Sequence, residues 1–355
     1  MKGRRQRMRR IAIEEHFGTE EYLAYLYSRK DYPKWEIVKD EKEGRIEKKW
    51  VDPSLPPTVV YPGRPGQPGR MTNLGEGRLM EMDKAGIDVA VLSLGHPSVE
   101  AFDALEGTTW AKKTNDELAR AVKRHPTRFA GLAALAPQDP GQAADELKRA
   151  VTELGLKGAL INSHVRGEYL DDRKFWTIFK TAEDLNVPIY VHPKWPAPDM
   201  AKPYSTYPGL SRAMWGFGAD GGLHALRLIL SGVFDQYPRL KIILGHLGEA
   251  LPFWLWRIDN RYAADSRGEP SVFQQPAKKP SEYFKENFFV TTSGMFSQPP
   301  FMCTYQVLGA DNIFFAADYP YESCEVAVKF MDSVPICDSD KEKIYHRNAE
   351  KLFSL

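Results

Sequence analysis

Four polar side chains stand at or near the ends of short apolar runs, and their chemical types suit a metal site. Glu14 and His16 lie two positions apart in IAIEEHF, so a strand would point both to the same face. His192 ends IYVH, and Asp318 ends IFFAAD. Carboxylate oxygens and imidazole nitrogens together bind Zn²⁺ or Mn²⁺. We therefore predict one divalent metal ion held by these four residues, although each alone could be a hydrogen-bonded core residue.

A fourth apolar run leads to a candidate acid–base pair. His246 follows the run at 242–244, and Glu249 comes three residues later. A carboxylate at that distance can hold one ring nitrogen, fix the tautomer and raise the basicity of the imidazole. We predict that His246 and Glu249 take part in catalysis. The alternative for Glu249 is an acidic residue in the first turn of a helix, where the helix dipole favours it, and the two interpretations are compatible.

The remaining histidines give weaker signals. His96 and His164 follow two further apolar runs, where each could line the same face or be a polar loop residue. His125 precedes a proline and His346 falls in the terminal helical pattern, so we expect both at the surface. His224 lies in LHALRLIL, a pattern that indicates helix packing rather than chemistry.

Eight apolar runs alternate with helical patterns, and these elements must position the polar residues. The runs are Ile11–Phe17, Val89–Leu94, Phe129–Leu135, Gly158–Ser163, Pro188–His192, Lys241–His246, Phe288–Ser293 and Ile313–Asp318. The helices include Gly75–Ala85, Lys112–Lys123, Ala143–Leu154 and Asp172–Leu185. This alternation predicts a (β/α)8 TIM-like barrel whose strand ends meet at one face. An open doubly wound sheet is the alternative, but the glycine-rich dinucleotide fingerprint does not follow the first run.

Two long segments interrupt the alternation, after the first and fifth strands. They span residues 18–73 and 194–222, and the stretch DPSLPPTVVYPGRPGQPGR in the first is too rich in Pro and Gly for a regular element. Loops of this length are usually functional or disordered, and in a barrel these two would lie on the catalytic face. We expect one domain over residues 1–355, with residues 1–9 as a basic N-terminal tail and 18–73 as an insertion on the catalytic face.

Composition narrows the possible partners. The formal net charge is +1, and the first ten residues carry six Lys or Arg, so the folded body is near −5 and we expect no binding to nucleic acid. No apolar run approaches the roughly 20 residues that span a bilayer, so we expect no membrane segment. Three cysteines without CxxC spacing fit a reducing cytoplasm. We therefore expect a cytoplasmic protein. We also expect it to form a homo-oligomer, either a dimer or a tetramer.

The motifs as a set resemble one enzyme family. IAIEEHF, the NSH of the fourth strand, VHP, GHLGEALPFWLWR and DYPYE are similar to the amidohydrolase-related decarboxylases, which include the γ-resorcylate, 2,3-dihydroxybenzoate, 5-carboxyvanillate and aminocarboxymuconate-semialdehyde enzymes. The resemblance implies a (β/α)8 fold, a single divalent metal and non-oxidative removal of CO2 from a phenolic acid. The matched positions are Glu14, His192 and Asp318 as metal ligands, His246 as the active-site imidazole, Arg257 and Tyr321 at the substrate and, more loosely, Arg64 at the substrate.

The match departs from part of the family at one ligand position. The residue at His16 is Ala in the 5-carboxyvanillate and 2,3-dihydroxybenzoate enzymes and His in the γ-resorcylate enzyme, so the substrate stays open among them. Other amidohydrolases use a carboxylated lysine on the fourth strand to bridge two metals. Lys157 precedes that strand, which argues against a binuclear site.

The resemblance implies a mechanism in which Asp318 protonates an electron-rich ring carbon of a small aromatic acid before CO2 leaves. His246 and Glu249 would manage the phenol proton, and Arg257 and Arg64 would clamp a second anionic group. The nearest rival is metal-dependent hydrolysis of a lactone, ester or amide, which uses the same ligands. A barrel that only binds a ligand is less consistent with the combined presence of His246, Asp318 and Arg257.

Overall fold

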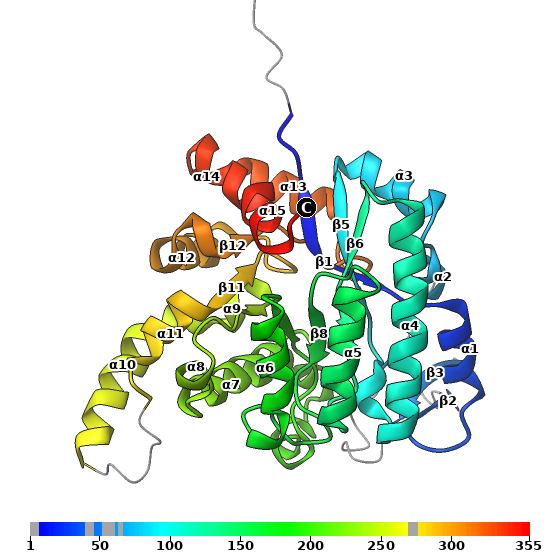
Figure 1. The fold of residues 1–355 in the computed structure, drawn as a ribbon, viewed down its shortest axis with the longest axis horizontal. Coiled ribbons are helices and arrows are strands. Elements are labelled where there is room, and N and C mark those ends of the chain that lie inside the picture. The colour runs from blue at the N-terminus through cyan, green and yellow to red at the C-terminus, as the bar shows by residue number, and fades with distance from the viewer. Residues whose placement is uncertain (1–6, 40–45, 52–60, 63–66, 269–275) are drawn as a thin grey trace, which may run out of the picture.

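Parallel strands and helices alternate along the computed structural model, as Figure 1 shows. The structure describes residues 7–39, 46–51, 61–62, 67–268 and 276–355. The strands of the two main sheets are β1 (Ile11–Phe17), β5 (Val89–Leu94), β6 (Phe129–Gly131), β7 (Ala133–Ala134), β8 (Ala159–Asn162), β9 (Ile189–His192), β10 (Ile242–Leu244), β11 (Phe288–Thr291) and β12 (Ile313–Phe314). Each predicted apolar run contains strand, and the third is divided between β6 and β7.

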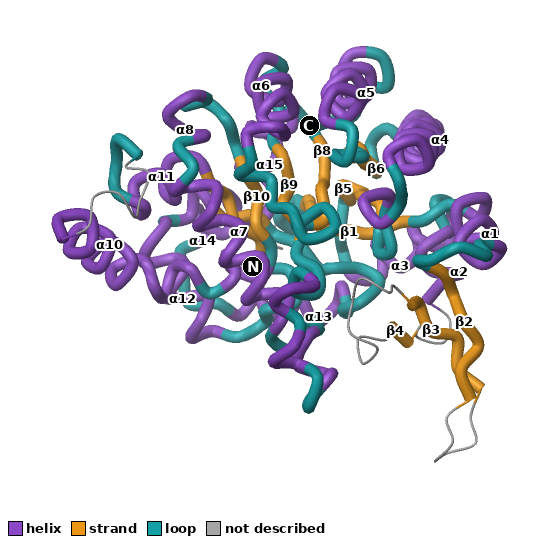
Figure 2. Tube along the Cα trace, turned by 90° about the horizontal axis from the view of Figure 1, so that it is seen from below, coloured by secondary structure: helices purple, strands orange, loops and turns teal. Residues whose placement is uncertain are grey.

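Helices follow most of these strands and run along their outer side in Figure 2. They are α3 (Glu76–Ala85), α4 (Ala104–Arg124), α5 (Pro140–Thr152), α6 (Trp176–Asp184), α7 (Gly216–Leu230), α8 (Val233–Gln236), α9 (His246–Glu249), α10 (Leu251–Gly268), α11 (Pro280–Asn287), α12 (Gln298–Leu308), α13 (Cys324–Ser333), α14 (Asp338–Glu342) and α15 (Asn348–Phe353). Short turns of other helix types are η1 (Val99–Ala101), η2 (Arg173–Phe175), η3 (Pro198–Met200), η4 (Lys202–Tyr204), η5 (Pro208–Ser211), η6 (Ala310–Asn312) and η7 (Lys343–Arg347).

Local sequence explains where the predicted helices begin and end. The side chain of Asp103 accepts a hydrogen bond from the Glu106 amide at the start of α4, and Asp139 caps α5 in the same way. α3 ends at Gly86, whose φ of 74° is a left-handed conformation that glycine adopts without a Cβ clash. The helix predicted from Lys112 begins earlier, at Ala104, because the cap lies at Asp103.

The parallel strands form two sheets, and the chain passes directly from one sheet into the other between β6 and β7. One sheet has the order β1-β5-β6 and the other β12-β11-β10-β9-β8-β7, with β6 and β7 adjacent in sequence. No continuous ladder joins β12 to β1 among the described residues. Three backbone hydrogen bonds connect them instead, from the amides of Ile13, His16 and Asp318 to the carbonyls of Phe315, Tyr319 and Glu14. The expected α/β arrangement of a TIM-like barrel is confirmed by this strand order, with an irregular seam between the last and first strands.

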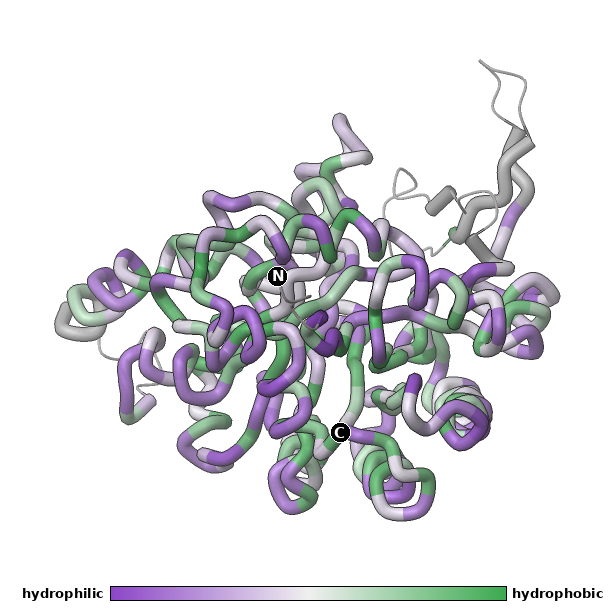
Figure 3. The backbone as a smooth tube through the Cα atoms, turned by 90° about the horizontal axis from the view of Figure 1, so that it is seen from above, coloured by the Kyte–Doolittle hydropathy of each residue, from purple (hydrophilic) through white to green (hydrophobic). Residues whose placement is uncertain are grey.

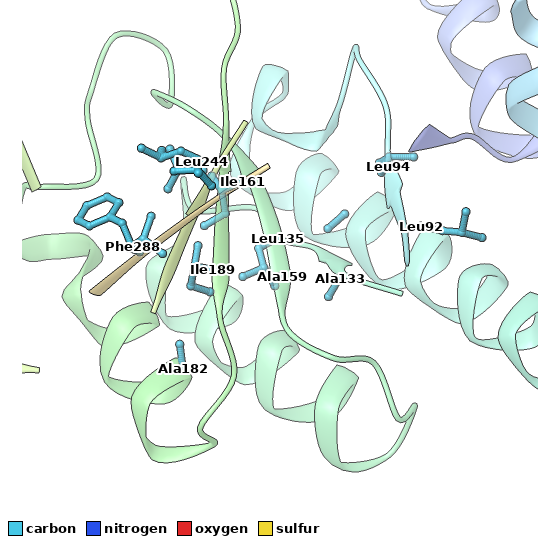
Figure 4. Packing of buried hydrophobic residues seen from close by; sticks show 14 of the residues in the cluster. Leu92, Leu94, Ala133, Leu135, Ala159, Ile161, Ala182, Ile189, Leu244 and Phe288 are labelled. Carbon is cyan, nitrogen blue, oxygen red and sulfur yellow. The ribbon is translucent and has the colours of Figure 1, made fainter. Parts of the chain in front are cut away.

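Alternate side chains of the strands build two hydrophobic clusters. One lies among the strands and includes Ile11, Ile13, Val91, Leu160 and Ile243. The other lies between the strands and the helices, and Figure 4 shows part of it, including Leu92, Ile161 and Phe288. Figure 3 shows that the outer helices alternate hydrophobic and hydrophilic residues along their turns, as expected for helices that cover a barrel on one face.

A β-bulge in β1 decides which way its polar residues point. Between Ala12 and Glu15 the strand contains one residue more than its partner β5. Ile11 and Ile13 face the inner cluster, and simple alternation would turn the next even-numbered residues outward. The extra residue reverses the alternation, because a bulge re-aims the side chains that follow it. Glu14 and His16 therefore face the inside, and Glu15 bonds the Ala317 amide on the other side.

The two long segments contain more regular structure than expected. Within 18–73 the structure describes α1 (Glu20–Ser28), the antiparallel strands β2 (Lys34–Lys39), β3 (Ile46–Val51) and β4 (Tyr61–Pro62), and α2 (Gln67–Thr72). The expectation of no regular element in the Pro- and Gly-rich stretch is wrong for β4 and α2. Pro62 is tolerated because β4 is an edge strand, with β3 as its one partner among the described residues. In the second segment α7 begins at Gly216, within the stretch expected to be loop.

The basic start of the chain is bound to the folded body where the structure describes it. Arg7 pairs with Asp88, and Arg9 pairs with Glu350. Residues 1–6 of the predicted tail lie outside the described residues. None of the described helices is long and apolar enough to cross a membrane.

Candidate active site

Four side chains from three strands meet at the carboxyl ends of the strands. Glu14 and His16 come from β1, His192 ends β9, and Asp318 follows β12. One ligand atom from each lies within 4.8 Å of the ligand atoms of the others. Glu14, His16 and His192 are buried, and Asp318 is partly buried. The structure thus brings together all four residues predicted as metal ligands.

The unpaired atoms of this group fit a bound cation. Glu14 Oε1, His16 Nε2 and Asp318 Oδ1 are buried without a hydrogen-bond partner among the described residues. His192 Nε2 lies 3.4 Å from Glu14 Oε1, and His16 Nε2 lies 3.2 Å from Asp318 Oδ1. A buried polar atom without a partner costs about 1–3 kcal/mol. Two nitrogens and two carboxylates that face one another would all be satisfied by one divalent ion.

Neighbouring hydroxyls orient Glu14 toward the group. Tyr190 and Thr291 both donate hydrogen bonds to Glu14 Oε2, the latter at 2.8 Å, which leaves Oε1 facing the imidazoles. Burial alone would raise the pKa of Glu14, but His192, His246 and His16 outweigh it and lower the pKa below its ordinary value. Glu14 is therefore ionised, as a metal ligand must be. Tyr190 and Thr291 were not predicted, because a tyrosine and a threonine inside strands indicate ordinary core packing.

His246 lies beside the group and is held by Glu249. Its Nδ1 is 2.7 Å from Glu249 Oε1, and its Nε2 is 4.0 Å from both Glu14 Oε1 and Asp318 Oδ2. Burial would lower the pKa of His246, but the carboxylates of Glu249, Asp318 and Glu14 raise it well above the ordinary value. The pair is thus in place for proton transfer next to the predicted metal.

The turn that carries this pair is not the regular helix start expected from the sequence. His246, Leu247, Glu249 and Ala250 have φ values of 50°, 59°, 52° and 62°. Non-glycine residues adopt such values rarely, and they persist where the surrounding structure holds them. Glu249 ends the short kinked turn α9, in which Leu247 and Gly248 have non-helical φ and ψ values, and regular helix begins at Leu251 in α10. Its hydrogen-bond partner is His246, as predicted for the acid–base pair.

A glycine-rich face of α7 makes room for Glu249. A Cβ at Gly218 would lie 3.1 Å from Glu249 Oε2, and one at Gly221 would lie 3.1 Å from Glu249 Cγ. A Cβ at Gly222 would lie 3.1 Å from the Glu249 carbonyl oxygen. The stretch GFGADGG therefore lets α7 approach the Glu249 turn closely, which explains why a helix tolerates so many glycines here.

We expect Gly221→Ala to lower kcat about ten- to a hundredfold, because the new methyl displaces the Glu249 carboxylate from His246. Helix propensity favours alanine by about 1 kcal/mol, so the fold itself should not weaken. Steady-state kinetics and thermal unfolding are measured together. Gly209→Ala is the matched control, since a Cβ there meets nothing within 4 Å. Wild-type kcat in Gly221→Ala would show that the carboxylate position is not critical.

Comparison with known proteins identifies the family. Residues 69–355 match the amidohydrolase family. The chain belongs to the amidohydrolase family. It is 38% identical over 357 residues to a γ-resorcylate decarboxylase of Polaromonas sp. strain JS666, with 98% of each chain covered.

Solved structures of amidohydrolase-type decarboxylases share the whole architecture. A 5-carboxyvanillate decarboxylase from Sphingomonas paucimobilis superposes with a TM-score of 0.86 and 38% identity, over 98% of this chain and 100% of the other. A dihydroxybenzoic acid decarboxylase from Polaromonas sp., with bound manganese and the inhibitor 2-nitroresorcinol, has a TM-score of 0.82 and 36% identity, with 98% of each chain covered. The expected family and the barrel-like fold are both confirmed by these matches.

The predicted substrate residues of this amidohydrolase lie in different places. Tyr321 is beside the metal-binding group, with its ring centroid 5.4 Å from that of His16 and its amide bonded to the Asp318 carbonyl. Arg257 is exposed on α10, and among the described residues no hydrogen bond or ion pair joins it to the metal-binding group. Arg64 lies outside the described residues. Of the two that the structure describes, Tyr321 lies at the site and Arg257 does not, and the roles of all three stay predictions.

The other histidines of this amidohydrolase divide between the site and the scaffold. His96 Nε2 lies 3.2 Å from His192 Nδ1, so His96 touches a predicted metal ligand. His164 instead bonds the Gly167 amide and the Trp195 carbonyl. His224 is fully buried in α7 and bonds Ser163 and the Leu170 amide, in agreement with the packing role expected for it. His125 and His346 are partly exposed and lie at helix ends away from the site.

Proposed function

We propose that this protein is a metal-dependent, non-oxidative decarboxylase of a hydroxylated aromatic carboxylic acid. The observation that carries the proposal is the meeting of Glu14, His16, His192 and Asp318, with three unpaired buried atoms, beside the His246–Glu249 pair. Relatives that align with nearly the whole chain are named as γ-resorcylate and 5-carboxyvanillate decarboxylases, which supports this reaction class.

The four clustered residues would hold one divalent ion, and manganese is the first candidate because a related solved structure contains it. Zinc also suits two imidazoles and two carboxylates. When bound, such an ion supplies Lewis-acid charge stabilisation and orients the carboxylate and the neighbouring phenol oxygen of the substrate. Glu14 is held for this role by Tyr190 and Thr291, which keep its free oxygen toward the imidazoles.

Asp318 and His246 would divide the proton transfers. Asp318 lies at the edge of the group and is partly exposed, so its carboxylate can take up a proton from solvent and pass it to the ring carbon that bears the substrate carboxylate. The C–C bond then breaks, CO2 leaves, and the released electron pair restores the aromatic ring. The His246–Glu249 pair would exchange the phenol proton with the substrate as it binds and as the product leaves.

A panel of hydroxylated benzoates tests this function. We expect the ultraviolet absorbance of the substrate to fall and one molecule of CO2 to be released for each molecule of substrate consumed. Metal-dependent hydrolysis of a lactone, ester or amide is the remaining alternative, and it would give a new carboxylic acid without CO2. A panel that includes 2,6-dihydroxybenzoate, 2,3-dihydroxybenzoate and 5-carboxyvanillate also separates the substrates left open by the presence of His16.

Removal of the metal is expected to abolish turnover reversibly. Purified protein should contain about one divalent ion per chain by elemental analysis, in keeping with a single four-ligand site. Dialysis against a chelator should remove both the ion and the activity, and Mn²⁺ should restore the activity more fully than Zn²⁺. Full turnover by metal-free protein in the presence of chelator would contradict the proposed site.

We also propose that the protein forms a homo-oligomer through the outer face of α10. Phe253, Trp254 and Trp256 are exposed there to 74%, 48% and 77%. Exposed aromatic side chains grouped in this way are typical of protein–protein interfaces. Arg257 is exposed on the same helix, so its predicted contact with substrate would require a second copy of the chain.

We expect Trp256→Glu to dissociate the oligomer, because a charge would replace the exposed aromatic anchor of the interface. Sedimentation velocity gives the assembly state, and Val326→Glu, half-exposed on α13, is the matched control. If dissociation also lowers activity with substrates that carry a second anionic group, Arg257 acts across the interface. An unchanged oligomer in Trp256→Glu would exclude this face.

A cytoplasmic location is part of the same proposal. Cys303, Cys324 and Cys337 are free thiols, which suits a reducing compartment. Fractionation of cells that produce the protein tests this location directly.

A further inference from the structure

His96 stands between the end of β5 and the metal-binding group. Its Nε2 atom lies 3.2 Å from His192 Nδ1 and also 3.2 Å from the Pro193 carbonyl oxygen. The His96 and His192 rings are 5.1 Å apart and inclined by 50°. The ring of Trp195, at 5.8 Å, also lies next to His96. His96 is thus held at contact distance from the side of His192 that faces away from Glu14.

We propose that His96 is a positioning residue that sets the tautomer and ring orientation of His192 for metal binding. The inference rests on the proposed metal site, and it assigns a function to a histidine whose position in the sequence left its role open. Residues that hold the second nitrogen of a metal-bound histidine typically change metal affinity about 10–100-fold when they are replaced.

The positions of the ring hydrogens explain how His96 would act on His192. His192 Nε2 is the atom that faces Glu14 Oε1, so it is the nitrogen available to a metal. A neutral imidazole that binds through Nε2 carries its hydrogen on Nδ1. That hydrogen points to His96 Nε2, which must then accept it with a lone pair. His96 therefore carries its own hydrogen on Nδ1 in the metal-bound protein.

The Pro193 carbonyl oxygen gives His96 Nε2 an acceptor to which it can donate in its other tautomer. With a hydrogen on Nε2, His96 donates to the Pro193 oxygen or to His192 Nδ1, both at the same distance. His192 would then carry its own hydrogen on Nε2, the form that cannot bind a metal through that atom. Metal binding and metal release thus select opposite tautomers of both histidines. The two rings carry the same number of hydrogens in both forms, but the change requires His96 Nδ1 to release one proton and His192 Nε2 to take one up.

The test compares metal affinity among variants of His96, by competition with a chelator of known affinity. His96→Leu keeps a similar apolar volume without an acceptor, and we expect it to weaken Mn²⁺ binding about 10–100-fold. His96→Gln keeps an acceptor and should recover much of the loss. Saturating Mn²⁺ should restore most of the kcat of His96→Leu, since His96 does not touch the reacting atoms. His125→Leu is the control, because its ring packs on Phe129 away from the site.

Several results would overturn the proposal. Wild-type affinity in His96→Leu would do so, as would equal losses in His96→Leu and His96→Gln, which would indicate packing only. If His96→Leu does not fold, nitrogen-15 NMR of histidine-labelled wild-type protein with Zn²⁺ decides: a hydrogen on His96 Nδ1 supports the proposal, and one on Nε2 contradicts it. Failure of the wild-type protein to bind any divalent metal would instead remove the proposed function itself.

Discussion

Asp318→Asn should lower kcat about 10²–10⁴-fold, the range in which general acids contribute. The amide cannot donate a carboxyl proton to the ring carbon, whereas its oxygen can still face a metal ion. Asp318 is also conformationally constrained, with a φ of 69° and its amide bonded to the Glu14 carbonyl. Asparagine tolerates this φ, so the backbone should not change. Turnover and metal content are measured on the same preparation.

The controls separate proton donation from loss of the ion. Asp311→Asn removes a carboxylate that only pairs with Lys343, and it should leave kcat unchanged. If the metal content of Asp318→Asn falls by the same factor as its kcat, loss of the ion explains the loss of activity. Asp318 would then be a metal ligand without evidence for a role as proton donor. A variant with bound metal and normal turnover would exclude Asp318 as the proton donor.

His246→Asn is expected to lower kcat by a similar factor, about 10²–10⁴-fold, while leaving the metal bound. His246 Nε2 lies 4.0 Å from the nearest oxygens of Glu14 and Asp318, so it contacts the site without completing the ligand set. Its loss removes the imidazole that exchanges the phenol proton with the substrate. Asparagine is small and polar enough to keep the hydrogen bond between the backbone amide and Ser293.

A second histidine–carboxylate pair provides the matched control. His346 lies 3.0 Å from Glu350 in a helix at the surface, and His346→Asn should change neither kcat nor metal content. Glu249→Gln added to His246→Asn should cost little more, because Glu249 acts through His246. Additive losses would show that Glu249 has a separate role, and normal turnover in His246→Asn would make the imidazole structural.

Strand periodicity predicted the fold and the pairing of Glu14 with His16, but not the direction in which they point. Because side chains alternate between the two faces of a strand, residues two positions apart lie on the same face, whether that face is inside or outside. The face depends on the bulge between Ala12 and Glu15, which is defined by the register of β5 rather than by any residue of β1. Register is a property of two strands, and a local pattern in one of them does not contain it.

The metal-ligand residues could be predicted from the sequence, whereas the residues that hydrogen-bond to them could not. Each ligand is a polar residue at a strand end, where an apolar pattern makes it conspicuous. Tyr190 and Thr291 have side chains that are as common in strands as apolar residues, so their hydrogen bonds to Glu14 leave no signal. The glycines of α7 suggested a loop, because the close approach that requires them involves Glu249, a residue far along the chain.

Because the seam between β12 and β1 joins the two ends of the chain, the metal-binding group can form only late in synthesis. Glu15 and the Ala317 amide that bonds it are 302 positions apart, and the neighbouring Glu14 and Asp318 belong to the same seam. A growing chain cannot assemble the four-ligand group until its last strand has left the ribosome. Nascent protein thus passes most of its synthesis without a formed site for metal, and an ion that binds afterwards ties the first strand to the last. Chains that stop before Asp318 should leave this seam open and should be preferred substrates for cellular proteases, which cleave locally opened structure.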